Sequence, residues 1–377
     1  MNMYENIDAY VLRLIRESSP QRTIWNVERI RQGKSASWNY IDGCMMTALL
    51  AMSDITGEAQ YFDFAEHFID DFVAEDGSIR SYEPEKFNLD DINEGRVLFS
   101  LLEKTGKEKY RKAAALLRRQ LEQQPRTYEG NFWHKAIYPN QVWLDGIYMA
   151  QPFYALYEKH LGSGDFRDTV SQIETVRSRM FDEEKHLYYH GYDASRSAFW
   201  ADPVTGRSKN FWLRSIGWFA VALADLLEIL PEGEDREKLG KIFAELMEGA
   251  ARYADEETGL YWQVVDQGGR EGNYLETSGS SMLAYAMLKG VRQGALDKEY
   301  AAKGQKTFRG IVEKYLSFTD GDLNLGGICL VAGLGPETNR RRDGSYEYYI
   351  SEPVVANDAK GVAPFLLCYT EIKRLQP

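Results

Sequence analysis

Residues 42–72 read DGCMMTALLAMSDITGEAQYFDFAEHFIDDF, and this stretch decides the fold. Its first part is apolar on most faces, which is typical of a buried helix. After Thr56-Gly57 the pattern becomes amphipathic, with charged residues along one face. The same turn and a similar amphipathic segment recur from Thr105-Gly-Lys-Glu-Lys-Tyr110 onward. A buried helix followed by an outer helix is therefore the repeating unit.

This alternation continues through the chain. Further apolar helices are expected to begin at Asp90, Asp145, Ser215, Ser278 and Lys360, and further amphipathic ones to lie near 5–17, 164–180, 234–254 and 298–316. Short strands are expected in the loops between them, at 181–193 and 254–266. The pattern predicts an all-α fold, an (α/α)6 barrel or six-hairpin toroid, forming a single domain over residues 1–377. An open α-solenoid is the alternative, although solenoid repeats are usually shorter and more regular.

Composition excludes several classes of partner. Lys and Arg total 45 and Asp and Glu total 57, a net charge of −12, so neither nucleic acid nor an anionic membrane is an expected partner. No run approaches the roughly eighteen apolar residues that a membrane span needs. The three cysteines are widely scattered and form no CxxC pair. Because the N-terminus shows no signal-peptide pattern, we expect a cytoplasmic protein. We expect the protein to be a monomer or a homodimer.

Three aspartates open predicted inner helices, whose starts should gather at one end of the barrel. They are Asp42, Asp90 and Asp145, and two of them follow a tryptophan closely, Trp38 and Trp143. The helix dipole stabilises a carboxylate at such a position, and helix capping alone explains any one of them. Three at equivalent starts favour a shared cleft, in which carboxylates can divide acid and base duties.

Histidine, tryptophan and arginine add candidate ligands at the same end. His134 and His190 lie in loops beside aromatic residues, where each could bind a sugar hydroxyl or be a satisfied core histidine. Trp212, Arg214 and Trp218 could form a stacking platform with a cationic arm, or could be core residues. No HExxH or other metal-ligand spacing is present, so we expect no metal and no cofactor.

Several motifs together resemble a known family. The chain is similar to the unsaturated rhamnogalacturonyl hydrolases, glycoside hydrolase family 105, which are related to the unsaturated glucuronyl hydrolases of family 88. The similarity runs from about residue 30 to the C-terminus. The motifs that carry it are Trp38-Asn-Tyr-Ile-Asp-Gly43, Leu89-Asp90, Tyr138–Met149, Tyr189-His-Gly-Tyr-Asp193, Trp212–Trp218, Glu276-Thr-Ser-Gly279 and Val355–Leu366.

The resemblance implies the barrel fold and a distinctive reaction. The substrate would be a disaccharide or short oligosaccharide from pectin-type polysaccharides with a terminal 4,5-unsaturated uronic acid, left by a polysaccharide lyase. The enzyme would hydrate the enol-ether double bond, with Asp145 as general acid and base and Asp90 assisting. The positions it implies for the pocket are Trp38, Tyr40, Asp42, His134, Trp143, His190, Trp212, Arg214 and Trp218.

One departure bears on the leaving sugar. The family often has Arg-Gly-Asn-Gly-Trp where this chain has Arg214-Ser-Ile-Gly-Trp218. An unsaturated glucuronyl hydrolase with a leaving sugar other than rhamnose is therefore an alternative. A sugar epimerase, a non-catalytic carbohydrate-binding protein and an endoglucanase are others. An epimerase would need a pair of proton-transferring histidines, and a binding protein would not need Asp145.

Overall fold

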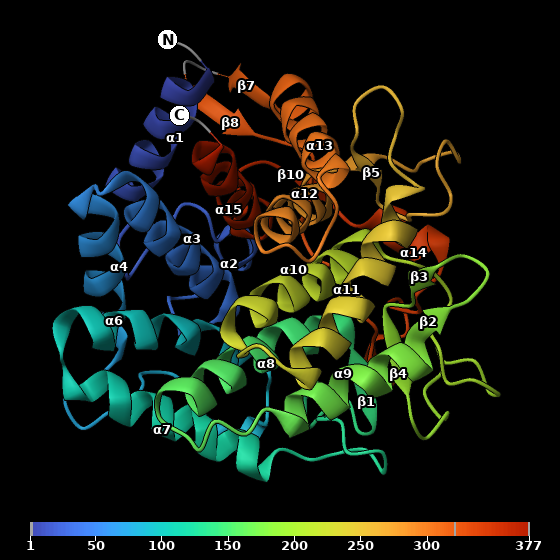
Figure 1. Cartoon of the computed structure of the whole chain (residues 1–377), viewed down its shortest axis with the longest axis horizontal. Coiled ribbons are helices and arrows are strands. Elements are labelled where there is room, and N and C mark those ends of the chain that lie inside the picture. The colour runs from blue at the N-terminus through green and yellow to red at the C-terminus, as the bar shows by residue number, and fades with distance from the viewer. Residues whose placement is uncertain (1–2, 320–321, 376–377) are drawn as a thin grey trace.

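The computed structural model describes residues 3–319 and 322–375, and its helices form two concentric rings (Figure 1). The inner ring consists of α3 (Tyr40–Thr56), α5 (Asp90–Asn93) with α6 (Val97–Thr105), α8 (Leu144–His160), α10 (Leu213–Ile229), α12 (Thr277–Arg292) and α15 (Ala359–Arg374). The outer helices are α1 (Met3–Arg16), α4 (Ala59–Phe72), α7 (Glu108–Gln123), α9 (Arg167–Met180), α11 (Glu234–Ala251) and α13 (Glu299–Tyr315).

The inner ring is closed. Helix α15 packs against α12 on one side and against α3 on the other, so the last inner helix contacts the first. The outer helix α1 packs on α15, where the Tyr369 hydroxyl donates to Asp8 at 2.9 Å and Lys373 pairs with the same carboxylate at 3.1 Å. Closure excludes the open solenoid and confirms the (α/α)6 barrel.

The inner helices are buried on most faces, as their sequences predicted. Sixteen of the seventeen residues of α10 are buried, because the helix lies between α8, α12 and α11. Apolar burial of this extent is the main stabilising contribution to such a barrel. In the outer helices only one face is buried; in α4 it consists of Tyr61, Ala65, Phe68, Ile69 and Phe72.

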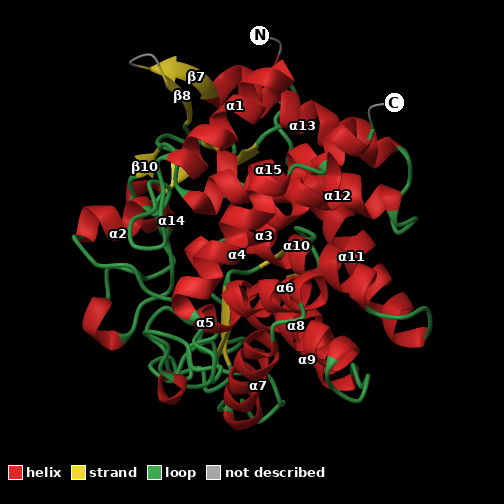
Figure 2. Cartoon of the chain, turned by 90° about the vertical axis from the view of Figure 1, so that its left-hand side faces the viewer, coloured by secondary structure: helices red, strands yellow, loops and turns green. Residues whose placement is uncertain are grey.

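Short elements and loops gather on one side of the helices (Figure 2). They include α2 (Val27–Gln32) and α14 (Tyr346–Ser351) (Figure 2). The described residues also contain the 3-10 turns η1 (Pro84–Lys86) and η3 (Glu337–Asn339). Five antiparallel strand pairs are present in the described residues: β1 (Gln141–Trp143) with β4 (Gly191–Asp193), β2 (Phe181–Asp182) with β3 (Leu187–Tyr188), β5 (Tyr261–Trp262) with β6 (Leu275–Glu276), β7 (Leu316–Thr319) with β8 (Asp322–Leu325), and β9 (Ile328–Cys329) with β10 (Val354–Val355). The strands expected at 181–193 and 254–266 are thus confirmed.

The second inner helix differs from its prediction, because it is broken. The 3-10 turn η2 (Glu94–Arg96) separates α5 from α6. A Cβ on Gly95 would lie 2.3 Å from Leu117 Cδ1, and a Cβ on Gly43 would lie 2.6 Å from the Cα of Glu94. Neighbouring elements therefore approach this backbone more closely than a regular row of side chains would allow. Among the described residues, none of the helices is both long and apolar enough to cross a membrane.

The close approach buries a carboxyl group completely. Glu94 Oε2 accepts the backbone N–H of Asn39, the N-cap of α3, at 2.8 Å. Its Oε1 has no hydrogen-bond partner in the described residues. Burial, reinforced by the negative charge of Asp42, raises the pKa of Glu94 well above its usual value. The unfolded chain therefore releases this proton at a lower pH than the folded chain does.

Glu94→Gln is expected to stabilise the protein increasingly as the pH rises. In the wild type the free energy of unfolding falls by about 1.4 kcal/mol per pH unit between the unfolded and folded pKa values of Glu94. Glutamine keeps a side-chain oxygen that accepts the Asn39 N–H. Because glutamine does not ionise, the decrease in the free energy of unfolding is removed. The measurement is Tm at pH 5 and pH 8, with the exposed Glu257→Gln as control. A Tm difference that is the same at both pH values would contradict the prediction.

Candidate active site

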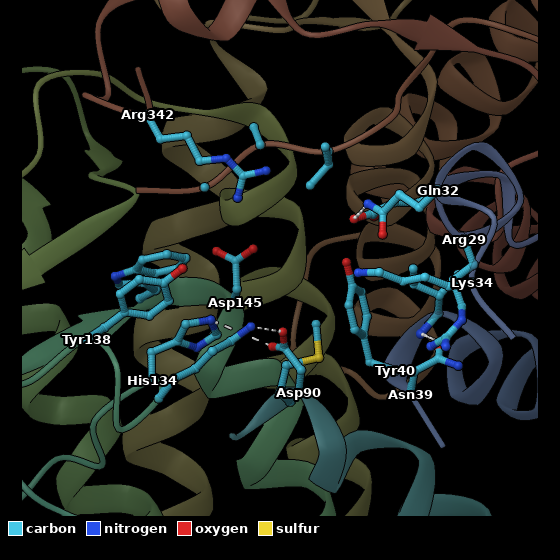
Figure 3. A pocket seen from close by; sticks show the side chains of 18 residues that line it. Arg29, Gln32, Lys34, Asn39, Tyr40, Asp90, His134, Tyr138, Asp145 and Arg342 are labelled. Atoms are coloured by element: carbon cyan, nitrogen blue, oxygen red, sulfur yellow. Dashed lines mark hydrogen bonds and ion pairs between the residues drawn. The ribbon is translucent and has the colours of Figure 1, made fainter. Parts of the chain in front are cut away.

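A cavity of about 240 Å³ opens among the short elements, at the N-terminal ends of α3, α5 and α8 (Figure 3). Three of the predicted helix starts therefore meet at one place. Its walls come from α2 and the residues after it, from the loop before β1 and from the segment after β9. The lining residues are Glu28, Arg29, Gln32, Lys34, Asn39, Tyr40, Ile41, Asp90, His134, Lys135, Tyr138, Trp143, Asp145, Met149, Val331, Ala332, Gly333 and Arg342.

Asp90, the first residue of α5, lies beside two basic side chains. Its Oδ2 accepts from Lys135 Nζ at 2.6 Å, and its Oδ1 lies 3.7 Å from His134 Nε2. Burial alone would raise the pKa of Asp90, but the charges of Lys135 and His134 outweigh it and the pKa is lowered. Burial also lowers the pKa of His134 to about 4. Near neutral pH the cluster thus holds a carboxylate, an ammonium group and a neutral imidazole.

Asp145, in the first turn of α8, has different neighbours. Its Oδ2 lies 3.1 Å from His190 Nε2, although the two atoms are not aligned for a hydrogen bond. His190 is fully buried, and its Nδ1 lies 2.7 Å from the Tyr349 hydroxyl. The side chain of Asp145 is 13% exposed and faces the cavity (Figure 3). Unlike Asp90, Asp145 forms no ion pair with a Lys or Arg side chain of the described residues.

An aromatic wall stands next to the two aspartates. The Trp143 ring stacks on His134 at 4.3 Å between centroids and on Tyr138 at 4.7 Å. Gly146 permits this packing, because a Cβ there would lie 2.9 Å from His134 Nδ1. Such a wall can hold the apolar face of a sugar ring.

Tyr40 completes the site from the start of α3. Burial, together with the charges of Glu28 and Asp90, raises its pKa well above the usual value, so its hydroxyl stays protonated. It can therefore donate a hydrogen bond to a ligand in the cavity. No group of three or more metal-ligating side chains occurs among residues 3–319 and 322–375. The expectation of no metal stays a prediction.

Comparison with known proteins identifies the family of the chain. A profile of Glycosyl Hydrolase Family 88 matches residues 16–376. The chain belongs to this family. It is also similar to a solved glycoside hydrolase of family 105 from C. acetobutylicum ATCC 824, at 39% identity, with all of both chains covered and a TM-score of 0.91. The resemblance to families 88 and 105 is thus confirmed.

Two curated relatives complete the comparison of this family 88 chain. Protein Atu3128 from Agrobacterium fabrum is 38% identical over 232 residues, which cover 59% of this chain and 97% of the relative. The unsaturated 3S-rhamnoglycuronyl hydrolase from Formosa agariphila is 25% identical over 175 residues, which cover 45% of this chain and 46% of the relative.

The structure brings five of the predicted residues of this family 88 hydrolase to the cavity lining and one directly behind it. Tyr40, Asp90, His134, Trp143 and Asp145 line the cavity, and His190 lies behind it against Asp145. The prediction that the starts of the inner helices meet at one end is confirmed for α3, α5 and α8.

Asp42 requires a correction, because it does not face the cavity. Its carboxylate accepts hydrogen bonds from the side chains of Thr23 (3.1 Å), Trp25 (2.8 Å), Asn26 (3.1 Å) and Asn39 (2.7 Å). Four donors occupy both oxygens of a side chain that is 3% exposed. Asp42 therefore attaches the segment before α2 to the start of α3.

Trp38, Trp212, Arg214 and Trp218 also lie outside the lining of the cavity. Trp38 donates its indole N–H to the Asp91 carbonyl at 2.8 Å, and Trp218 stacks on Tyr148 inside the barrel at 4.4 Å. Both are packing residues, the alternative that the sequence left open for Trp218.

Trp212 and Arg214 form a buried layer behind His190. The Trp212 ring packs on His190 at 4.7 Å, and the Arg214 guanidinium lies 5.0 Å from the Trp212 ring. Arg214 finds its partners in the Cys329 carbonyl at 2.5 Å and the Ser278 hydroxyl at 3.3 Å. The two residues thus support the site from behind.

The sequence did not single out several residues that line the cavity. Lys135 belongs to the loop of His134, and its proximity to that residue was its one available signal. Tyr138 begins the motif Tyr138–Met149 but was not named as a site residue. Arg29, Lys34 and Arg342 come from segments with no periodic pattern and no recognisable motif.

Proposed function

We propose that this glycoside hydrolase removes a terminal 4,5-unsaturated uronic acid from lyase-generated oligosaccharides by hydrating its double bond. The observation that carries the proposal is the contrast between two carboxyl groups in one cavity. Asp90 is held ionised by Lys135 at 2.6 Å, whereas Asp145 faces the cavity beside His190 with no cation paired to it. Such an asymmetric pair can divide the duties of charge stabilisation and proton transfer.

The reaction follows from the chemistry of an enol ether. Asp145 donates its proton to C4, and positive charge develops at C5, shared with the ring oxygen. Water adds to C5 and returns a proton to the Asp145 carboxylate. The resulting hemiketal opens to a ketone at C5, and the ring oxygen remains on C1 as a hydroxyl. That C1 hemiacetal expels the next sugar as an alcohol, so one water is consumed and Asp145 is regenerated.

The remaining groups have supporting roles. The Asp90 carboxylate lies at the same cavity and can accept hydrogen bonds from sugar hydroxyls or from the attacking water. The stack of Tyr138, Trp143 and His134 offers a flat surface to the sugar ring. His190, fixed by Tyr349, orients the Asp145 carboxyl group.

The identity of the leaving sugar is the more specific part of the proposed substrate. We infer an unsaturated rhamnogalacturonan disaccharide from pectin as substrate, on the strength of the family resemblance. The curated relative from Formosa agariphila, whose name includes a rhamnoglycuronyl unit, supports rhamnose at this position. The cytoplasmic location stays a prediction.

The ultraviolet absorbance of the conjugated double bond tests the reaction. Mixing the enzyme with a lyase-generated unsaturated disaccharide is expected to lower the absorbance as the next sugar is released, with one sugar freed per double bond lost. The saturated disaccharide of the same linkage is the control and should not be cleaved. Cleavage of both at comparable rates would exclude hydration, and epimerisation of either without cleavage would favour the epimerase.

A further inference from the structure

Three consecutive arginines near the cavity differ in their partners. Arg340 pairs with Glu337 at 2.5 Å, and Arg341 pairs with Glu352 at 2.8 Å. Arg342 has no side-chain hydrogen bond or ion pair with any residue of 3–319 or 322–375. The one arginine of the three that lines the cavity is therefore the one that lacks a counterion.

The position of Arg342 is fixed by its backbone. Its carbonyl accepts the N–H of Gly335 at 2.7 Å, and its own N–H donates to the Asn339 carbonyl at 3.2 Å. A Cβ on Gly333 would lie 3.4 Å from both Arg342 Nη1 and Trp143 Cζ3, so the guanidinium and the Trp143 ring both border Gly333. Figure 3 shows the guanidinium directed into the same space as the carboxyl group of Asp145.

The other cationic side chains that line the cavity either have partners or lie on the wall opposite Asp145. Lys135 is neutralised by Asp90, and Arg29 donates to the Ser37 hydroxyl and the Ser35 carbonyl. Lys34 is an exposed side chain on the opposite wall from Asp145 (Figure 3). Arg342 is half-buried and forms no ion pair within the described residues. Glu28, a cavity anion whose pKa the Arg342 charge helps to lower, is itself paired with Lys360 at 3.0 Å. A guanidinium in that state favours an anionic group, and a carboxylate fits it in a bidentate manner.

We propose that Arg342 binds the C6 carboxylate of the terminal unsaturated uronic acid, an inference that rests on the proposed function. This carboxylate is attached to C5, one of the two atoms of the double bond. Holding it fixes C5 directly and places the neighbouring C4 toward Asp145. Arg342 is thus a specificity-determining residue, which selects uronates over neutral unsaturated sugars and orients the bond that is protonated.

The test compares Arg342→Gln with the wild type on two substrates, the unsaturated disaccharide and its C6 methyl ester. The ester removes the negative charge and keeps the double bond. We expect the wild type to prefer the acid over the ester by about thirtyfold in kcat/KM. The Arg342→Gln variant should prefer the acid by less than about threefold, because it has lost a charge-assisted bidentate contact. Esterification also alters the reactivity of the double bond, but this effect is common to both enzymes and cancels in the ratio.

Two further variants show whether the effect depends on the guanidinium. Arg340→Gln removes a neighbouring exposed arginine and should keep the full preference for the acid. Arg342→Lys keeps the charge without the bidentate geometry and should give an intermediate preference. An unchanged preference in Arg342→Gln, or an equal loss on both substrates, would overturn the inference and leave the proposed function standing. Absence of turnover of every unsaturated disaccharide by the wild type would overturn the proposed function and the inference together.

Discussion

Asp145→Asn is expected to fold normally, to bind the unsaturated disaccharide and to lose about a thousandfold in kcat. Asparagine has nearly the shape of aspartate and can occupy the same place in the first turn of α8. Its amide can neither give an acidic proton to C4 nor accept one from water. General acid–base help of this kind contributes about a hundred- to ten-thousandfold.

The measurement is kcat from the fall in absorbance, with affinity from titration and folding from circular dichroism. Asp42→Asn is the matched control, because this aspartate also lies in the first turn of an inner helix but bonds four protein donors. It should lower Tm and keep kcat within about threefold. If Asp145→Asn retained more than about a tenth of wild-type kcat, the loss would be under about 1.4 kcal/mol. That is too little for the residue that protonates the double bond.

The second large effect is expected at Asp90. Asp90→Asn should lower kcat/KM about a hundredfold, because the amide carries no charge and accepts fewer hydrogen bonds. The ion pair with Lys135 makes a sharper test possible. Lys135 is the main charge that keeps the pKa of Asp90 low against the effect of burial. Removing it allows burial to raise that pKa.

Lys135→Met should therefore lose activity on acidification at a higher pH than the wild type does. The direction follows because the active form is taken to have Asp90 ionised, and a raised pKa protonates it earlier as the pH falls. The measurement is kcat/KM from pH 4 to pH 9. Lys104→Met, which breaks an exposed ion pair with Asp54 of the same 2.6 Å length, is the control and should match the wild type. An acid limb at the same pH in wild type and Lys135→Met would contradict the assignment.

The sequence by itself determined the barrel. Alternating segments that are apolar all round and apolar on one face bury their surface as an inner and an outer layer, and each pair of segments was visible locally. The contact of α15 with α3 then closed these layers into rings. It also indicated the end that carries the site, since loops, aspartates and aromatic residues recur at the starts of the inner helices. Asp90 and Asp145 followed from that pattern and from the family resemblance.

Tertiary structure decided which of the equivalent residues face the cavity. Asp42 and Asp145 are both followed by glycine, yet Asp42 bonds donors from residues 23–26, which come together with α3 only when the chain folds. Hydrophobic periodicity predicts whether a residue is buried, but it does not predict which side chains that residue contacts. The contacts between Asp145 and His190 and between Asp90 and Lys135 form where the loops of neighbouring hairpins pair, with the Leu144 N–H donating to the His190 carbonyl and the Leu89 N–H to the His134 carbonyl. Arg342 comes to the same cavity from the segment after β9. Burial was therefore encoded locally, whereas the charges that meet in the cavity were set by the packing of the whole ring.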